Sequence, residues 1–183
     1  MPENPLEALT ESYKRLRHTY GYGVHSPFAF EMLEKILPNR GYSYYAEDEI
    51  DNLARSRKER RRAMMIHRLV ARYGVHDVWV SPEVSPCLLQ AIRKAGTGLK
   101  VRKDAADMHR SQFILDCNSS LTPQRIVELL SSADMMIMIQ DCDGNIANVL
   151  GCEGFPGVMF YSPDCLLLAS RKGMRFTSYS VRL

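Results

Sequence analysis

The chain has 183 residues, of which 45% are hydrophobic and 25% charged, and its formal net charge is +3. These values are typical of one globular domain with a buried core, and the charge is too small to indicate a nucleic-acid partner by itself. No apolar run approaches the ~20 residues of a membrane-spanning helix, so we expect no membrane association.

The cysteines and the first residues bear on the compartment. Five cysteines are scattered along the chain without a C-x-x-C pair, which predicts reduced thiols. The opening residues MPENP lack the basic and apolar regions of a secretory signal. We therefore expect a cytoplasmic protein.

The first part of the sequence, residues 1–74, is predicted to be helical. Apolar side chains recur at three- and four-residue spacing over residues 5–20, which indicates an amphipathic helix. Ser26-Pro27 is a typical helix start, with serine as N-cap and proline at the first helical position. A long helical pattern, continuous or split in two, covers residues 48–73 and is expected to end at Gly74.

The second part, residues 75–183, alternates between strand and helix patterns, which predicts an α/β core with a largely parallel sheet. The apolar strand 134–140 should be central and buried on both faces. The turn at Arg171-Lys172-Gly173 predicts that the final strands form an antiparallel hairpin at one edge of a mixed sheet. The expected strands are 76–81, 99–102, 112–116, 134–140, 157–161, 164–170 and 175–182, and the expected helices are 84–95, 122–131 and 145–151.

Several segments in the right order resemble a bacterial family. Residues 22–28 (YGVHSPF) are similar to the H-G-x-H-S-P-F segment that opens a group of S-adenosylmethionine-dependent methyltransferase-like proteins, and the basic helix 63–73 is similar to the one that follows. Residues 113–125, 137–143 and 158–183 resemble the group's V-F-I-D-G-N-H segment, its strand ending in D-D and its closing strands. The resemblance implies a Rossmann-like fold of methyltransferase type.

The turn after the first strand departs from that family. The resemblance implies a glycine-rich turn, roughly E-x-G-x-x-x-G, because the backbone there must approach the cofactor and adopt positive φ. The counterparts here are Val80, Pro82 and Pro86. Proline fixes φ near −65° and lacks an N–H donor, so this turn is not expected to bind S-adenosylmethionine in the usual way.

The segment after strand 99–102 departs as well. The family places an acidic residue on the ribose hydroxyls, and here either Lys103 or Asp104 falls near that position. Only residues 103–112 separate the second strand from the third, so the helix and strand that usually enclose the adenine have no room. If the cofactor position is kept, its polar candidates are Ser81, Glu83, Ser85 and Asp104.

Asp116 and Asp141 are the candidate metal ligands. Each ends an apolar strand, and strand carboxyl ends face the ligand crevice in open α/β sheets. The resemblance to metal-dependent O-methyltransferases implies that such positions hold Mg²⁺ with a third oxygen, which Asp143 or Asn118 could supply because Cys142 replaces the family's second acid. The alternative is that both aspartates cap the turns that follow them.

The basic run Arg55–Arg62 contains six cationic residues and one glutamate. It predicts either a patch for phosphate or nucleic acid or a solvated helix face, and we favour the solvated face because acidic residues lie just upstream and no aromatic residue interrupts the run.

Three functions follow. The leading hypothesis is a methyltransferase-like protein that has lost normal S-adenosylmethionine binding and catalysis, has no cofactor, and acts as a binding, regulatory or structural partner of another protein or of itself. The alternative is a divergent O-methyltransferase that uses S-adenosylmethionine and Mg²⁺ at Asp116 and Asp141. The second alternative is an RNA- or phosphate-binding module. The sequence assigns no catalytic residue.

Overall fold

The structure is a computed structural model that describes the chain apart from residues 1–4, 20–23, 25, 38–43 and 182. The helices are α1 (Pro5–Thr19), α2 (Pro27–Glu31), which continues into the π-helix η1 (Met32–Ile36), α3 (Tyr44–Leu53), α4 (Arg57–Tyr73), α5 (Pro86–Lys94), the 3₁₀ helix η2 (Ala105–Arg110), α6 (Pro123–Ser132) and α7 (Gly144–Glu153). The strands are β1 (Asp77–Val80), β2 (Lys100–Arg102), β3 (Phe113–Asp116), β4 (Met136–Gln140), β5 (Gly157–Ser162), β6 (Cys165–Ser170) and β7 (Thr177–Ser180).

The strands form one seven-stranded mixed sheet in the order β2-β1-β3-β4-β6-β5-β7. The first four strands are parallel, and β6 is antiparallel to both of its neighbours. All five residues of β4 are buried, as predicted for a central strand. The chain is therefore an α/β protein compatible with a Rossmann-like fold, as the sequence predicts.

The antiparallel hairpin lies one strand earlier than predicted. A two-residue turn, Pro163-Asp164, joins β5 to β6, and these strands pair antiparallel over their whole length. The strand after Gly173 does not pair with β6 but runs parallel to β5, at the edge of the sheet. The prediction of a hairpin around Gly173 is wrong because β4 and β5 occupy both edges of β6, which leaves only the outer edge of β5 for β7.

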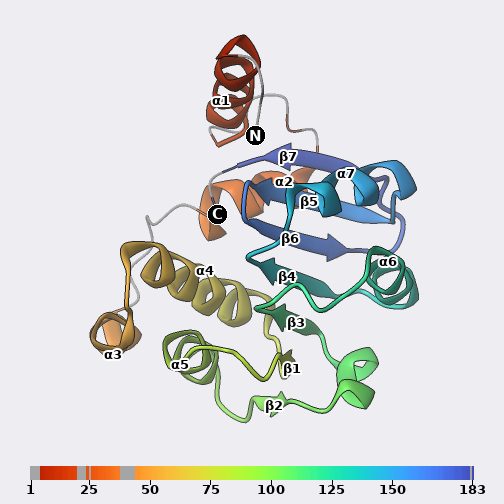
Figure 1. The fold of residues 1–183 in the computed structure, drawn as a ribbon. Helices are drawn as coiled ribbons and strands as arrows, with labels where there is room; N and C mark the ends of the chain where they lie inside the picture. The colour runs from red at the N-terminus through yellow and green to blue at the C-terminus, as the bar shows by residue number, and fades with distance from the viewer. Residues whose placement is uncertain (1–4, 20–23, 25, 38–43, 182) are drawn as a thin grey trace.

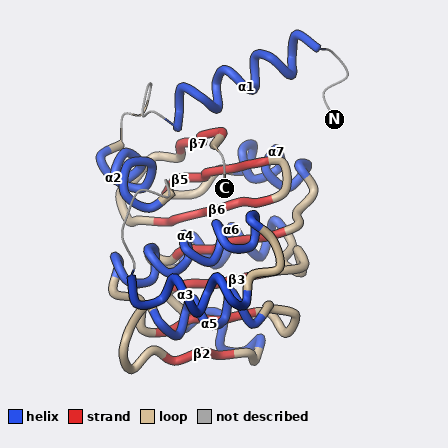
Figure 2. The backbone as a smooth tube through the Cα atoms, turned by 90° about the vertical axis from the view of Figure 1, so that its left-hand side faces the viewer, coloured by secondary structure: helices blue, strands red, loops and turns tan. Residues whose placement is uncertain are grey.

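Helices cover both faces of the sheet (Figures 1 and 2). Helix α4 packs on α5, which also contacts α3, and this group lies on one face, while α6 and α7 lie on the other. The helical N-terminal region packs on the first face and buries it. One apolar cluster there contains Ile50 of α3, Leu69 of α4 and Phe113 of β3. The two predicted parts thus share one hydrophobic core.

Local signals explain where the N-terminal helices begin and end. The side chain of Ser26 caps α2 by accepting a hydrogen bond from the Ala29 N–H at 3.3 Å, and Pro27 follows it. His25, in the segment on which the family resemblance depends, lies outside the described residues. Gly74 ends α4 in the left-handed region with φ +58, as predicted.

None of the described helices combines the length and the apolar character needed to cross a bilayer.

Candidate functional site

A hollow opens at the carboxyl end of the parallel strands. From β1 the chain passes to β2 on one side, and β3 and β4 lie on the other, so the direction of strand addition reverses between β1 and β3. Ligands of open α/β sheets bind at this kind of position. We call this hollow, of about 270 Å³, the crevice. It is lined by Ser56, Lys58, Glu59 and Arg62 at the start of α4, by Glu83, Ser85 and Leu88 around the start of α5, and by Cys117, Gln140 and Asp141 at the ends of β3 and β4.

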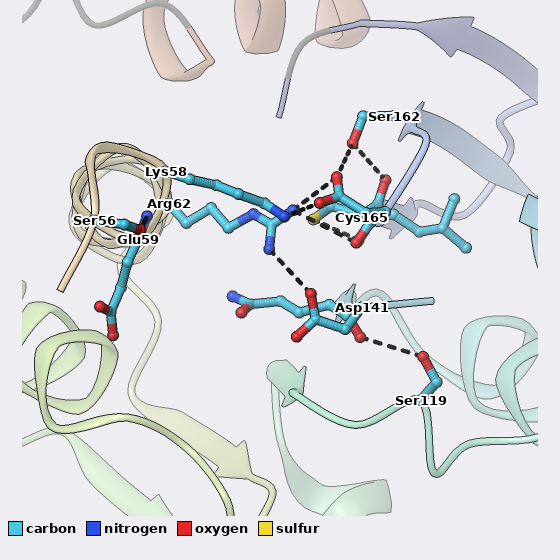
Figure 3. A network of polar contacts seen from close by, with 11 residues as sticks. Ser56, Lys58, Glu59, Arg62, Ser119, Asp141, Ser162 and Cys165 are labelled. Carbon is cyan, nitrogen blue, oxygen red and sulfur yellow. Dashed lines mark hydrogen bonds and ion pairs between the residues drawn. The ribbon is translucent and has the colours of Figure 1, made fainter. Parts of the chain in front are cut away.

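The first turn of α4 supplies the cations of the crevice. Ser56 caps this helix by accepting from the Glu59 N–H at 3.1 Å, which fixes where the basic run becomes helical. Arg62 lies one turn further along and is only 4% exposed, an unusual burial for a charged side chain. Figure 3 shows Lys58 and Arg62 extending from α4 toward Ser162 and Cys165, the residues that flank the β5–β6 turn.

A carboxylate in that turn holds both cations. The Nη2 atom of Arg62 is 3.0 Å from Oδ1 of Asp164, and Lys58 donates a hydrogen bond to the other carboxylate oxygen. The Nη1 atom of Arg62 is 3.8 Å from a carboxylate oxygen of Asp141, at the end of β4. Two carboxylates from different strand ends therefore compensate the buried guanidinium and fasten α4 across the sheet.

Two buried donors that border the crevice have no hydrogen-bond partner in the described part of the chain. They are Nε of Arg62 and Nε2 of Gln140. The residue Gln140 is 6% exposed, and its backbone carbonyl accepts from the Ser119 hydroxyl at 3.2 Å while its side-chain amide nitrogen stays unpaired. Because a buried donor without a partner costs about 1–3 kcal/mol, such groups commonly mark the position of a ligand or water.

Of the four predicted cofactor residues, Glu83 and Ser85 line the crevice. Ser85 also caps α5, accepting from the Leu88 N–H at 3.3 Å, with Pro86 at the first helical position. Ser81 is buried, and its hydroxyl accepts from the Cys117 N–H at 3.0 Å, which joins the ends of β1 and β3. The turn with the two prolines therefore serves as a helix start and a strand connection.

Asp104 is not among the residues that line the crevice. Its side chain caps η2 by accepting from the Ala106 N–H at 3.0 Å, and its carbonyl accepts from Nε1 of Trp79 at 2.9 Å. Residues 103–112, which separate the second strand from the third and for which the sequence predicts neither helix nor strand, contain this 3₁₀ helix, and the indole of Trp79 holds it against β1.

The structure gives the two candidate metal ligands different environments. Asp116 is fully buried, and its carboxylate accepts from the Leu121 N–H at 3.0 Å and the Ser120 hydroxyl at 3.0 Å, so it organises the loop after β3. Asp141 has a mostly exposed side chain and φ +52, and it lines the crevice, whereas Asp116 does not. No group of three or more histidine, cysteine or acidic side chains is placed to hold a metal ion among the described residues.

The basic run does not form one uniform patch. Arg60 makes an ion pair with Asp51 of the preceding helix, and Lys58 and Arg62 pair with Asp164. Lys58, Arg60 and Arg62 are thus bound to carboxylates of the same chain, and Lys58 and Arg62 line the crevice. The sequence did not assign Arg62, Gln140 or Asp164 to the site.

The sequence signal for Arg62 was its helical register. A cation four residues before the buried Ile66 and seven before the buried Leu69 lies on the core face of α4.

Comparison with known proteins gives no match: no family model, no curated protein and no solved structure matches this chain.

Proposed function

We propose that this chain is a methyltransferase-like protein that binds a small polar ligand in the crevice and has lost normal S-adenosylmethionine binding and methyl transfer. The observation that carries the proposal is the pair of unpartnered buried donors, on Arg62 and Gln140, at the border of a hollow of about 270 Å³. Pockets that enclose drug-sized ligands measure roughly 300–1,000 Å³, so the crevice favours a molecule smaller than a complete nucleoside cofactor.

The charges around the crevice indicate the class of ligand. Lys58 and Arg62 contribute two positive charges, and Glu59, Glu83 and Asp141 contribute three negative charges. The unpartnered donors require acceptor oxygens, but the lining as a whole repels a polyanion. A small zwitterion or a neutral polar molecule satisfies both requirements, whereas a phosphate or an RNA backbone satisfies only the first.

The lining favours binding over catalysis. Burial raises the pKa of the Cys117 thiol to about 11, so the thiolate needed for nucleophilic attack is scarce at neutral pH. No histidine is among the side chains that line the crevice in the described part of the chain. The engagement of Asp116 in its own loop also gives no support to the metal-dependent alternative.

The first test is calorimetry with S-adenosylmethionine and S-adenosylhomocysteine, with and without Mg²⁺. We expect no binding tighter than a Kd of about 100 μM, which corresponds to about −5.5 kcal/mol. Tighter binding of either compound would overturn the proposed loss of cofactor binding.

The second test concerns the ligand class. Amide NMR spectra of the whole chain are titrated with alanine as a zwitterion, acetate as a simple carboxylate and inorganic phosphate as an anion. We expect saturable shifts around the crevice with alanine, weaker shifts with acetate, and none with phosphate. Gln140→Leu should abolish the alanine shifts, while Gln124→Leu, an exposed change on α6, should keep them. Phosphate binding alone, or identical titrations of both variants, contradicts the assignment.

A further inference from the structure

The crevice presents acceptors to a ligand as well as donors. Its buried donors, Nε of Arg62 and Nε2 of Gln140, have no hydrogen-bond partner among the described residues. Its lining also contains the carboxylates of Glu59, Glu83 and Asp141. A ligand that satisfies the donors also meets these acids, so the acids decide which ligands the crevice accepts.

The three carboxylates differ in what already holds them. Glu59 accepts a hydrogen bond from the Arg55 N–H at 2.7 Å, and a carboxylate oxygen of Asp141 lies 3.8 Å from Nη1 of Arg62. Glu83 makes no hydrogen bond and no ion pair with any residue in the described part of the chain. Glu83 is therefore the carboxylate that a cationic group can bind without displacing a contact of the chain itself.

The turn that carries Glu83 is fixed by the sheet. The Ser81 N–H donates to the Leu115 carbonyl at 2.9 Å, and the Val84 N–H closes the turn on the Ser81 carbonyl at 3.2 Å. Pro82 occupies the second position of this turn, for which its restricted φ is well suited. Because the backbone is already held, binding a ligand at Glu83 costs little additional ordering of the chain.

Glu83 and the donors reach the crevice from different elements. Glu83 follows β1 and Gln140 ends β4, with β3 between these two strands, while Arg62 comes from α4. Neighbouring strands are about 4.8 Å apart, so β1 and β4 are separated by about 10 Å. A small molecule in the crevice therefore meets the donor of Gln140 toward β4 and the carboxylate of Glu83 toward β1.

We propose that Glu83 binds the ammonium group of the crevice ligand and so selects a small amino acid over a simple carboxylate. The carboxylate of the amino acid accepts from Nε of Arg62 and Nε2 of Gln140. Lys58 and Arg62 already pair with Asp164, so a ligand that brings only negative charge is repelled by Glu83 and offers it no partner. This assignment rests on the proposed function and adds the residue that distinguishes a zwitterion from an acid.

Amide NMR titrations of the whole chain with alanine and with acetate test the role of Glu83. We expect Glu83→Gln to weaken alanine binding about threefold to fivefold, as is typical of an ion pair that stays in contact with water, and not to weaken acetate binding. Glu59→Gln removes the same charge from the lining and should weaken alanine binding less. Glu153→Gln, an exposed change at the end of α7, should leave both titrations unchanged.

The possible failures are distinguishable. If alanine does not bind the wild type, the proposed function fails and the role of Glu83 fails with it. If alanine binds, but Glu83→Gln weakens that binding no more than Glu59→Gln does, or weakens acetate binding equally, only the role of Glu83 is overturned. A lower melting temperature of Glu83→Gln with unchanged alanine affinity also overturns it, because Glu83 would then act only on the dipole at the start of α5.

Discussion

The guanidinium of Arg62 lies 3.0 Å from a carboxylate oxygen of Asp164, a residue 102 positions later in the chain. Arg62 is buried in α4, whereas the side chain of Asp164 is 38% exposed in the β5–β6 turn. The pair therefore fastens the N-terminal helical region to the antiparallel part of the sheet. The pair holds the guanidinium of Arg62, which lines the crevice, and so fixes the position of the unpartnered Nε donor.

Replacing Arg62 by methionine should lower the free energy of unfolding by about 1–3 kcal/mol. The change keeps the buried aliphatic contacts but removes one of the two cations that pair with Asp164, whose exposure and remaining partner, Lys58, limit the loss. Urea unfolding followed by circular dichroism measures the difference. Arg57→Met, an exposed change on the same helix, should have little effect. Equal stability of the two variants would contradict this role.

The same pair predicts a pH dependence. Partial burial acts to raise the pKa of Asp164, but the hydrogen bond from Lys58 and the charge of Arg62 outweigh it, and the pKa lies below its usual 3.8. A carboxyl whose pKa is lowered by folding stabilises the protein above its unfolded pKa, and this contribution is lost as the pH falls through the folded pKa.

The stability difference between the wild type and Asp164→Asn should accordingly be constant above about pH 5 and shrink below about pH 4. Urea unfolding midpoints of both proteins across that pH range measure this stability difference. Replacing Lys58 by methionine should reduce its pH dependence. A difference that stays constant into strong acid speaks against the ion pair as its source.

Much of the fold was predictable because its signals are local. Ser26-Pro27 begins α2 and Gly74 ends α4 as expected, since capping depends on a few adjacent residues. The central place of β4 followed from its continuous apolar sequence. The partner of β7 was not predictable, because it depends on which strand edge stays free after β6 inserts between β4 and β5.

The candidate site was only partly predictable for the same reason. Glu83 and Ser85 follow the first strand, in the turn where the family resemblance implies the cofactor position, and both line the crevice. The charge run alone does not show which of its cations faces inward, and only the register of Arg62 with the apolar residues Ile66 and Leu69 of the same helix indicates it. Asp164 is brought to Arg62 only by the tertiary fold.

The cysteines should differ sharply in reactivity. Burial raises the pKa of Cys117 to about 11 and that of Cys165 to about 12, whereas Cys152 is exposed on α7. At about pH 8 a thiol with a pKa of about 11 is ionised in roughly one molecule in a thousand, and the thiolate is the reactive form. Iodoacetamide should therefore modify Cys152 first in the native protein, as peptide mass mapping can show. Rapid native labelling of Cys165 would contradict its burial.

Asp116→Asn should destabilise the chain by about 1–3 kcal/mol regardless of Mg²⁺. The buried carboxylate accepts hydrogen bonds from the Leu121 N–H and the Ser120 hydroxyl, and an amide replaces one acceptor oxygen by a donor that has no partner there. Thermal unfolding of the wild type and the variant, with and without MgCl₂, separates a structural aspartate from a metal ligand. A ligand role requires that Mg²⁺ stabilise the wild type and not the variant, since an ion bound only to the folded state raises the melting temperature. The loop geometry instead predicts that Asp116→Asn loses the same stability relative to the wild type with and without MgCl₂. Asp143→Asn is the control, because it removes an ordinary capping carboxylate at the exposed N-cap of α7.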